Sequence, residues 1–149
     1  MKAQVNEIKI SYKGRVLSKD WRKLKSSSDT ANFIFEYWDK DTIEAHESFK
    51  VLLLNNANKV KGIIEISKGG ITGTLVDLRL LIAVVLKSLS VAIILTHNHP
   101  SGTLTPSASD KAITQKIKKA AAFFDVKILD HIIITPNADY FSFADEGLL

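Results

Sequence analysis

The stretch VAIILTHNHPSGTLTPSASD, residues 91–110, places metal-binding types of side chain directly after an apolar run. Its first part, Val91–Thr96, is short, continuous and rich in β-branched residues, as is typical of a buried strand. From Ser107 to about Phe124 the pattern predicts a helix with apolar positions on one face. The polar loop between them therefore lies at the carboxyl end of a buried strand, where open α/β sheets bind their ligands.

Four side chains in this stretch are spaced so that they can reach one point. Alternate residues of an extended chain point the same way, which brings His97 and His99 together. Residues three apart on a helix share a face, which does the same for Ser107 and Asp110. Two imidazoles and one carboxylate are the protein ligands of an open zinc site, with water in the fourth position. We therefore predict that His97, His99 and Asp110 bind Zn²⁺.

The start of the helix after this loop has two possible forms. Ser107 and Asp110 resemble a capping box, although Glu or Gln is usual in the last position. Alternatively, Thr105 caps the helix and Pro106 occupies its first position, which leaves Ser107 and Asp110 free to face the metal. Either form places the partial positive charge of a helix N-terminus beside the predicted site.

The amino-acid composition excludes several classes of protein and of metal site. A chain of 149 residues that is 46% hydrophobic and 24% charged is expected to fold as one globular domain. The absence of cysteine excludes disulfides, Cys-based metal sites and the zinc nucleobase deaminases, which need Cys ligands. No secretion signal and no membrane-spanning stretch is recognisable, so we expect a cytoplasmic protein without membrane contact.

The net charge of +4 permits contact with nucleic acid. The lysines are dispersed, however, along residues 13–25 and 111–127. This dispersion favours solvated surfaces, so we expect at most weak nucleic-acid contact.

The remaining pattern predicts a mixed β-sheet with helices packed against it. The predicted order is a strand near residues 5–12, a helix from Ser28 or Asp29 to about Asp39, a hairpin of Ser48–Leu54 and Lys59–Ser67, a flexible connection with Gly69, Gly70 and Gly73, a helix at Val76–Leu89, the strand and helix described above, and a closing pair of strands at Lys127–Thr135 and Tyr140–Phe143. The helix at Val76–Leu89 is apolar almost all round, which predicts that it is buried.

The constellation of His97, His99, Ser107 and Asp110 resembles that of the JAMM (MPN+) metallohydrolases. The segments HNHPSG, PSASD, LDHIII and YFSFADEGLL are most similar to the RadC branch. The resemblance covers roughly Glu47–Leu149 and implies an α/β fold, a mixed sheet flanked by helices in an α/β/α arrangement like that of cytidine deaminases. It leaves residues 1–46 as an N-terminal extension of a strand and a helix, which is too short to supply the helix-hairpin-helix-like region of many RadC proteins.

The resemblance also implies roles for particular side chains. The family requires a Glu in the strand upstream of the histidines, and Glu65 in IIEIS takes that position, ahead of the weaker candidates Glu36, Glu44 and Glu47. This Glu would be the general base, and Ser107 would stabilise the oxyanion.

Three further residues match the family pattern without an assigned role. Asp130 and His131 match it as a pair that either supports the ligands of the metal site without binding the metal or has a purely structural role. Arg79 matches it too, although Leu78 stands where proline is usual.

The implied function is zinc-dependent hydrolysis of a peptide or isopeptide bond, with a protein or peptide as substrate. Two alternatives stay open. The letters His97-Asn98-His99 and the basic charge invite comparison with the HNH nucleases. The DNA-repair label of the RadC family also allows a non-catalytic protein associated with DNA repair.

Overall fold

The computed structural model of the chain describes residues 3–9, 11–69 and 75–149. Its centre is a mixed sheet with the strand order β2-β1-β3-β4-β5. The strands are β1 (Ser48–Leu54), β2 (Val60–Lys68), β3 (Ala92–Asn98), β4 (Lys127–Ile134) and β5 (Tyr140–Ser142). Strands β3 and β4 are parallel and the other neighbours are antiparallel. The predicted hairpin, central strand and closing pair of strands are therefore confirmed.

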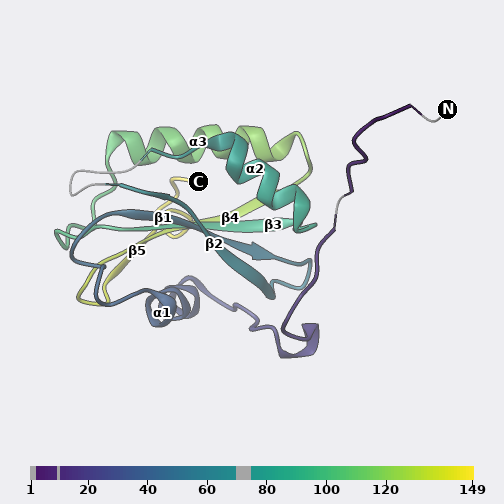
Figure 1. Cartoon of the computed structure of the whole chain (residues 1–149). Coiled ribbons are helices and arrows are strands. Elements are labelled where there is room, and N and C mark those ends of the chain that lie inside the picture. Colours follow the sequence, from purple (N-terminus) through teal and green to yellow (C-terminus); the bar gives the residue numbers. More distant parts are fainter. Residues whose placement is uncertain (1–2, 10, 70–74) are drawn as a thin grey trace.

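Helices cover both faces of this sheet, as the α/β/α prediction requires. Helix α1 (Ser27–Tyr37) lies on one face, and helices α2 (Leu78–Lys87) and α3 (Ala108–Ala122) lie on the other (Figure 1). Each interface has its own apolar core. Alternate residues of β3 serve the two cores, with Ile94 on the α1 side and Ile93 and Leu95 on the side of α2 and α3.

Helix α1 begins earlier than predicted, because Ser26 rather than Ser28 or Asp29 is its N-cap and accepts a hydrogen bond from the Asp29 backbone. Ile34 and the C-cap residue Trp38 are buried against the sheet, whereas Tyr37 is exposed. Helix α1 thus completes a core with β1, β3 and β4. The division of the chain at residue 46 stays a prediction.

Three expectations for local structure are wrong. Residues 3–9 and 11–17 form no strand, and Val5 and Ile8 are exposed because no described strand pairs with them. Helix α2 is not buried all round, because it lies in an outer layer and only one of its sides contacts the sheet; Leu81 and Val85 are buried, while Leu80 and Leu86 are exposed. Helix α3 ends at Ala122 rather than near Phe124, which lies in the following turn and is exposed.

The predicted glycine connection is described only at Gly69, whose backbone N–H donates to the Glu47 carbonyl. Gly70 and Gly73 lie outside the described residues. Among the described helices, none is long and apolar enough to cross a membrane.

A substitution at Ile34 can show whether the packing of α1 against the sheet stabilises the fold. The side chain is fully buried between α1 and the sheet. We expect Ile34→Ala to lower the free energy of unfolding by about 2–5 kcal/mol, because it leaves a cavity in the core. Urea unfolding monitored by tryptophan fluorescence measures this loss. Asn32→Ala, at an exposed position of the same helix, is the control; equal losses in the two variants would contradict the role of α1.

Candidate metal centre

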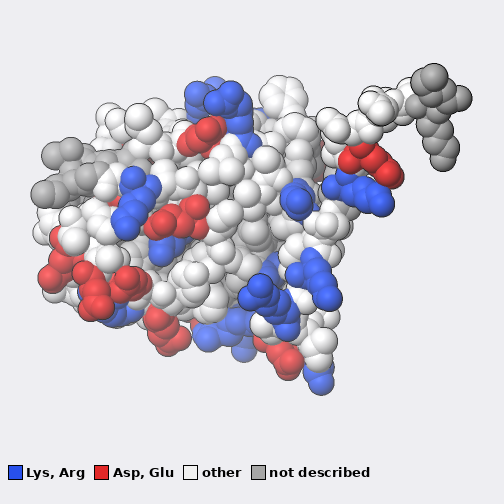
Figure 2. Space-filling model, in the orientation of Figure 1, with Lys and Arg blue, Asp and Glu red and all other residues white. Residues whose placement is uncertain are grey.

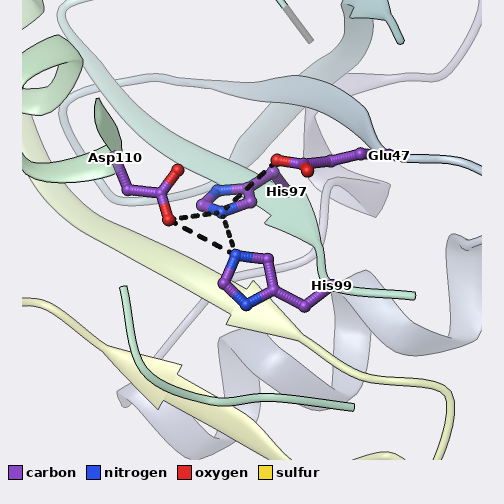
Figure 3. A group of neighbouring side chains, drawn as sticks. All are labelled: Glu47, His97, His99 and Asp110. Atoms are coloured by element: carbon purple, nitrogen blue, oxygen red, sulfur yellow. Dashed lines mark hydrogen bonds and ion pairs between the residues drawn. The ribbon is translucent and has the colours of Figure 1, made fainter. Parts of the chain in front are cut away.

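Four side chains converge at the end of β3: three from the stretch of residues 97–110 and Glu47, which is 50 residues earlier in the sequence. Glu47, His97, His99 and Asp110 each offer one ligand atom, and these atoms lie within 4.8 Å of one another (Figure 3). The Nε2 atoms of the two histidines are 3.0 Å apart, and Asp110 Oδ2 lies 3.4 Å from His97 Nε2 and 3.3 Å from His99 Nε2. Ligands of a tetrahedral zinc ion with bonds of 2.0–2.1 Å are about 3.3 Å apart. The donor set and its spacing therefore fit a metal ion.

His97 is held in the sheet interior by both neighbours of β3. It pairs with Phe49 on β1 and with Ile133 on β4, and its side chain is only 1% exposed. The Phe49 ring stacks on the imidazole with centroids 6.1 Å apart. Water therefore cannot satisfy the ring nitrogen that faces away from the cluster, and the protein must do so.

His99 lies just beyond the end of β3, where its backbone N–H still donates to the Ile134 carbonyl. A tight turn follows, closed by a hydrogen bond from Gly102 N–H to the His99 carbonyl, and Gly102 has φ of +84°, which favours glycine. The turn brings the Thr103 carbonyl to 2.6 Å from His99 Nδ1. A carbonyl only accepts, so Nδ1 carries the proton and Nε2 is left free to bind a metal.

Asp110 and Ser107 form the capping box of α3. Ser107 is the N-cap: its hydroxyl accepts from Asp110 N–H at 3.0 Å, and its own N–H donates to Asp110 Oδ2 at 2.8 Å. The alternative with Thr105 as cap is therefore wrong. Capping does not withdraw Asp110 from the cluster, because the oxygen that accepts from Ser107 has a further lone pair for the histidine side.

The carboxylate beside the histidines belongs to Glu47, and the predicted placement of Glu65 is wrong. Glu65 pairs with Lys50, and Lys50 pairs with Thr96. Side chains directly opposite each other in antiparallel strands lie on the same face. Glu65 thus projects on the α1 side of the sheet with Thr96, whereas the neighbouring His97 projects on the opposite side.

Glu47 immediately precedes β1, two residues before Phe49, the residue that pairs with His97. Its Oε1 lies 3.8 Å from His97 Nε2, and its side chain is 16% exposed. No local sequence signal identifies Glu47; it is the antiparallel pairing of β1 with β3 that carries residue 47 to the level of residue 99.

Asn98 holds the loop that carries Glu47. Its side chain is fully buried on the face opposite to His97. Oδ1 accepts from Ser48 N–H at 2.8 Å, and Nδ2 donates to the carbonyls of Ile43 and His46 at 2.8 and 2.9 Å. The middle residue of His97-Asn98-His99 is thus committed to the backbone around Glu47 and does not face the cluster.

His131, on β4, lies directly behind His97. It is fully buried, and its Nε2 is 2.7 Å from His97 Nδ1. Asp130 projects to the other side of the sheet, where it accepts hydrogen bonds from Ser142 Oγ and Ala144 N–H. Of the two roles considered for this pair, the position of His131 is that of support behind the site, and the contacts of Asp130 are structural.

Arg79 lies apart from this cluster. It is on α2, where its exposed side chain is 3.6 Å from Asp77. The structure therefore brings together His97, His99 and Asp110 of the predicted residues, with Ser107 hydrogen-bonded to Asp110, but not Glu65 or Arg79.

The charges at the cluster favour an ionised carboxylate. Burial raises the pKa of Asp110, but the hydrogen bonds that His97 and His99 donate to it when their Nε2 atoms are protonated outweigh burial and hold that pKa far below its ordinary value. Burial lowers the pKa of His99, but the hydrogen bond that the protonated ring donates to Asp110 outweighs burial, so the pKa of His99 is raised. Burial and the neighbouring His97 keep the pKa of His131 well below the ordinary value. Burial therefore favours the neutral form of the His131 ring.

The hydrogen bonds of the Asn98 side chain are expected to contribute to the stability of the fold. Replacement by Ala leaves one buried N–H and two carbonyls of residues 43–48 without their partner. We expect Asn98→Ala to lower the free energy of unfolding by at least about 1–3 kcal/mol, the cost of an unsatisfied buried polar group. Denaturant unfolding of the metal-free protein measures this. Asn55→Ala, in the exposed turn of the β1–β2 hairpin, is the matched control, and a smaller loss at Asn98 than at Asn55 would contradict the anchoring role.

The chain is similar to a known family and to curated bacterial proteins over most of its length. The family model described as a RadC-like JAB domain matches residues 24–148. A UPF0758 protein of Flavobacterium johnsoniae is 56% identical over 103 residues, 69% of this chain and 44% of that protein. One from Porphyromonas gingivalis is 47% identical over 103 residues, 69% of this chain and 45% of that protein. The chain spans about half the length of these curated relatives. By the extent of the match, this chain belongs to the RadC-like JAB domain family.

Proposed function

We propose that this protein is a zinc-dependent hydrolase that cleaves an amide bond in a peptide or isopeptide. The observation that carries the proposal is the convergence of His97 Nε2, His99 Nε2 and Asp110 Oδ2, 3.0–3.4 Å apart, beside the carboxylate of Glu47. This set supplies the two imidazoles and one carboxylate of an open zinc site and adds a candidate base. Zinc held by these residues would lower the pKa of a bound water to about 7 and would polarise a carbonyl group.

Glu47 is the general base in this proposal, in place of Glu65. Its Oε1 is further from His97 Nε2, at 3.8 Å, than Asp110 Oδ2 is, at 3.4 Å. A carboxylate just outside the ligand set can accept the proton of the attacking water and deliver it to the leaving amine. Glu47 is also partly exposed, so a substrate can approach it.

Ser107 supplies a hydrogen-bond donor to the carbonyl oxygen of the substrate. Its hydroxyl oxygen accepts from Asp110 N–H, so the hydroxyl proton is not used in the cap. The residue is exposed at the N-terminus of α3, where partial positive charge also favours a developing oxyanion.

An amide substrate is better supported than a nucleic acid. Asn98 serves the backbone, which removes the basis for the comparison with HNH nucleases. On the face drawn in Figure 2, basic side chains lie in separate groups with acidic side chains nearby. Such a surface favours weak, salt-sensitive contact with phosphates. The complete donor set also favours an enzyme over a non-catalytic protein associated with DNA repair.

The ligand assignment predicts metal content. We expect about one zinc per chain in the purified protein and loss of that zinc in His97→Ala and Asp110→Ala, because each variant removes one of three ligands. Elemental analysis after dialysis measures this, with circular dichroism to confirm folding. His46→Ala removes a histidine outside the cluster and should keep its zinc. Full zinc occupancy in both ligand variants would refute the assignment.

Matched substitutions at Glu47 and Glu65 test which glutamate is the general base. Glu47→Gln should retain zinc and lose about 10²–10⁴-fold in turnover, the usual contribution of a general base. Glu65→Gln, on the other side of the sheet, should retain both. The assay compares a peptide and isopeptide library with single- and double-stranded DNA, with and without a chelator. DNA cleavage that is abolished by the chelator and by Glu47→Gln, without amide cleavage, would replace the peptidase by a nuclease.

A further inference from the structure

A chain of buried hydrogen bonds runs behind His97, on the side away from the candidate metal position. His97 Nδ1 lies 2.7 Å from His131 Nε2, and His131 Nδ1 lies 2.6 Å from Thr114 Oγ1. Thr114 Oγ1 in turn lies 2.6 Å from the backbone carbonyl of Asp110. The side chains of Thr114 and His131 are fully buried and that of His97 is 1% exposed. The chain therefore connects two predicted ligands, His97 on β3 and Asp110 on α3, through the interior.

The positions of the protons in this chain follow from its last acceptor. A carbonyl has no proton, so the short contact between Thr114 and Asp110 must use the hydroxyl proton of Thr114. Thr114 Oγ1 then has to accept at its other contact, which requires a proton on His131 Nδ1. With its single proton on Nδ1, the His131 ring accepts at Nε2, so His97 must donate from Nδ1. This leaves the lone pair of His97 Nε2 directed at His99 and Asp110.

Among the residues that the structure describes, no further hydrogen-bonding partner contacts the side chains of Thr114 and His131. Phe143 stacks on the His131 ring with centroids 4.5 Å apart, and Phe49 meets it edge-on at 5.6 Å. These rings exclude water from the space behind His97, so the direction of the hydrogen bonds depends on Thr114 and His131 alone.

We propose that Thr114 and His131 are positioning residues that set the tautomer and orientation of His97 for metal binding. The inference rests on the proposed metal site and goes beyond it, because neither residue touches the metal position. It gives His131 a specific task and adds Thr114, which no sequence pattern singled out. Groups that orient a ligating histidine in this way typically contribute 10–100-fold to metal affinity or activity.

Thr114→Val and Thr114→Ser separate positioning from packing. Valine has nearly the shape of threonine but has no hydroxyl, which leaves the His131 Nδ1 proton without its acceptor; serine keeps the hydroxyl. We expect the zinc dissociation constant of Thr114→Val, measured by competition with a chromophoric chelator, to rise about 10–100-fold. Thr114→Ser should stay close to the wild type. Melting of the metal-free proteins shows separately what each substitution costs in folding.

The outcomes distinguish this inference from the proposed function. If the wild-type protein binds no zinc, the proposed function fails and the inference fails with it. If the wild type binds zinc and Thr114→Val binds it equally well, only the positioning role is overturned. An equal loss of affinity in Thr114→Ser and Thr114→Val would also overturn it, because the hydroxyl would not be the deciding group.

Nuclear magnetic resonance of the unsubstituted, zinc-loaded protein tests the same point without a variant. Two-bond ¹⁵N–¹H correlations of the histidine rings report which nitrogen carries the proton. We expect both His97 and His131 to be protonated at Nδ1 and not at Nε2. A His131 ring protonated at Nε2 would reverse the hydrogen-bond chain and overturn the proposal.

Discussion

The pairing of β3 with a strand on each side is the constraint on which the site depends. Because β1 and β4 both bond to β3, His97 lies in the interior with no water to satisfy its ring. An imidazole in such a place is tolerated only if both nitrogens have partners. His131 is the partner of His97 Nδ1, and the cluster at the end of β3 contains the partners of His97 Nε2. Burial of one histidine thus requires a polar arrangement on both sides of its ring.

Each member of the cluster is held by a second contact made by its own local structure. The turn closed by Gly102 directs the His99 ring through the Thr103 carbonyl, and the capping box directs the Asp110 carboxylate. Asn98 ties down the loop that carries Glu47. These supports come from neighbouring residues in sequence or from the adjacent strand, so the four donors are arranged before any ion binds. Preorganisation of this kind lowers the cost of assembling a metal site.

Helix α3 contributes to the site through three residues that follow one another along its first two turns. Ser107 caps it, Asp110 in its first turn faces the histidines, and Thr114 lies one turn further on, where its hydroxyl bonds to the carbonyl four residues earlier. A threonine that bonds back in this way normally offers the helix little. Here the same hydroxyl also hydrogen-bonds to Nδ1 of His131 on β4. This second hydrogen bond links the helix to the sheet behind the site. Asp110 at the candidate metal centre and Thr114 behind it therefore lie one turn apart on the same helix.

Local sequence patterns determined much of this protein, and three-dimensional pairing decided the rest. The spacing of His97, His99 and Asp110 identified the cluster because strand alternation and helix periodicity act over a few residues. The same local rules predicted the mixed sheet and its helices, but they overestimated the burial of α2 and proposed a strand near residues 5–12 that has no partner. They also identified the capping box without deciding between Ser107 and Thr105.

The choice of Glu47 over Glu65 lay beyond local patterns, because it depends on which strand lies beside β3 and in which register. The family resemblance placed a Glu in the strand upstream of the histidines, and Glu65 lies in such a strand, yet the pairing of Lys50 with Thr96 turns Glu65 to the other face. The contacts of Thr114 with His131, and of His131 with His97, span 17 and 34 residues. Only the folded sheet and helix bring such positions together, since nothing in the intervening sequence relates them physically.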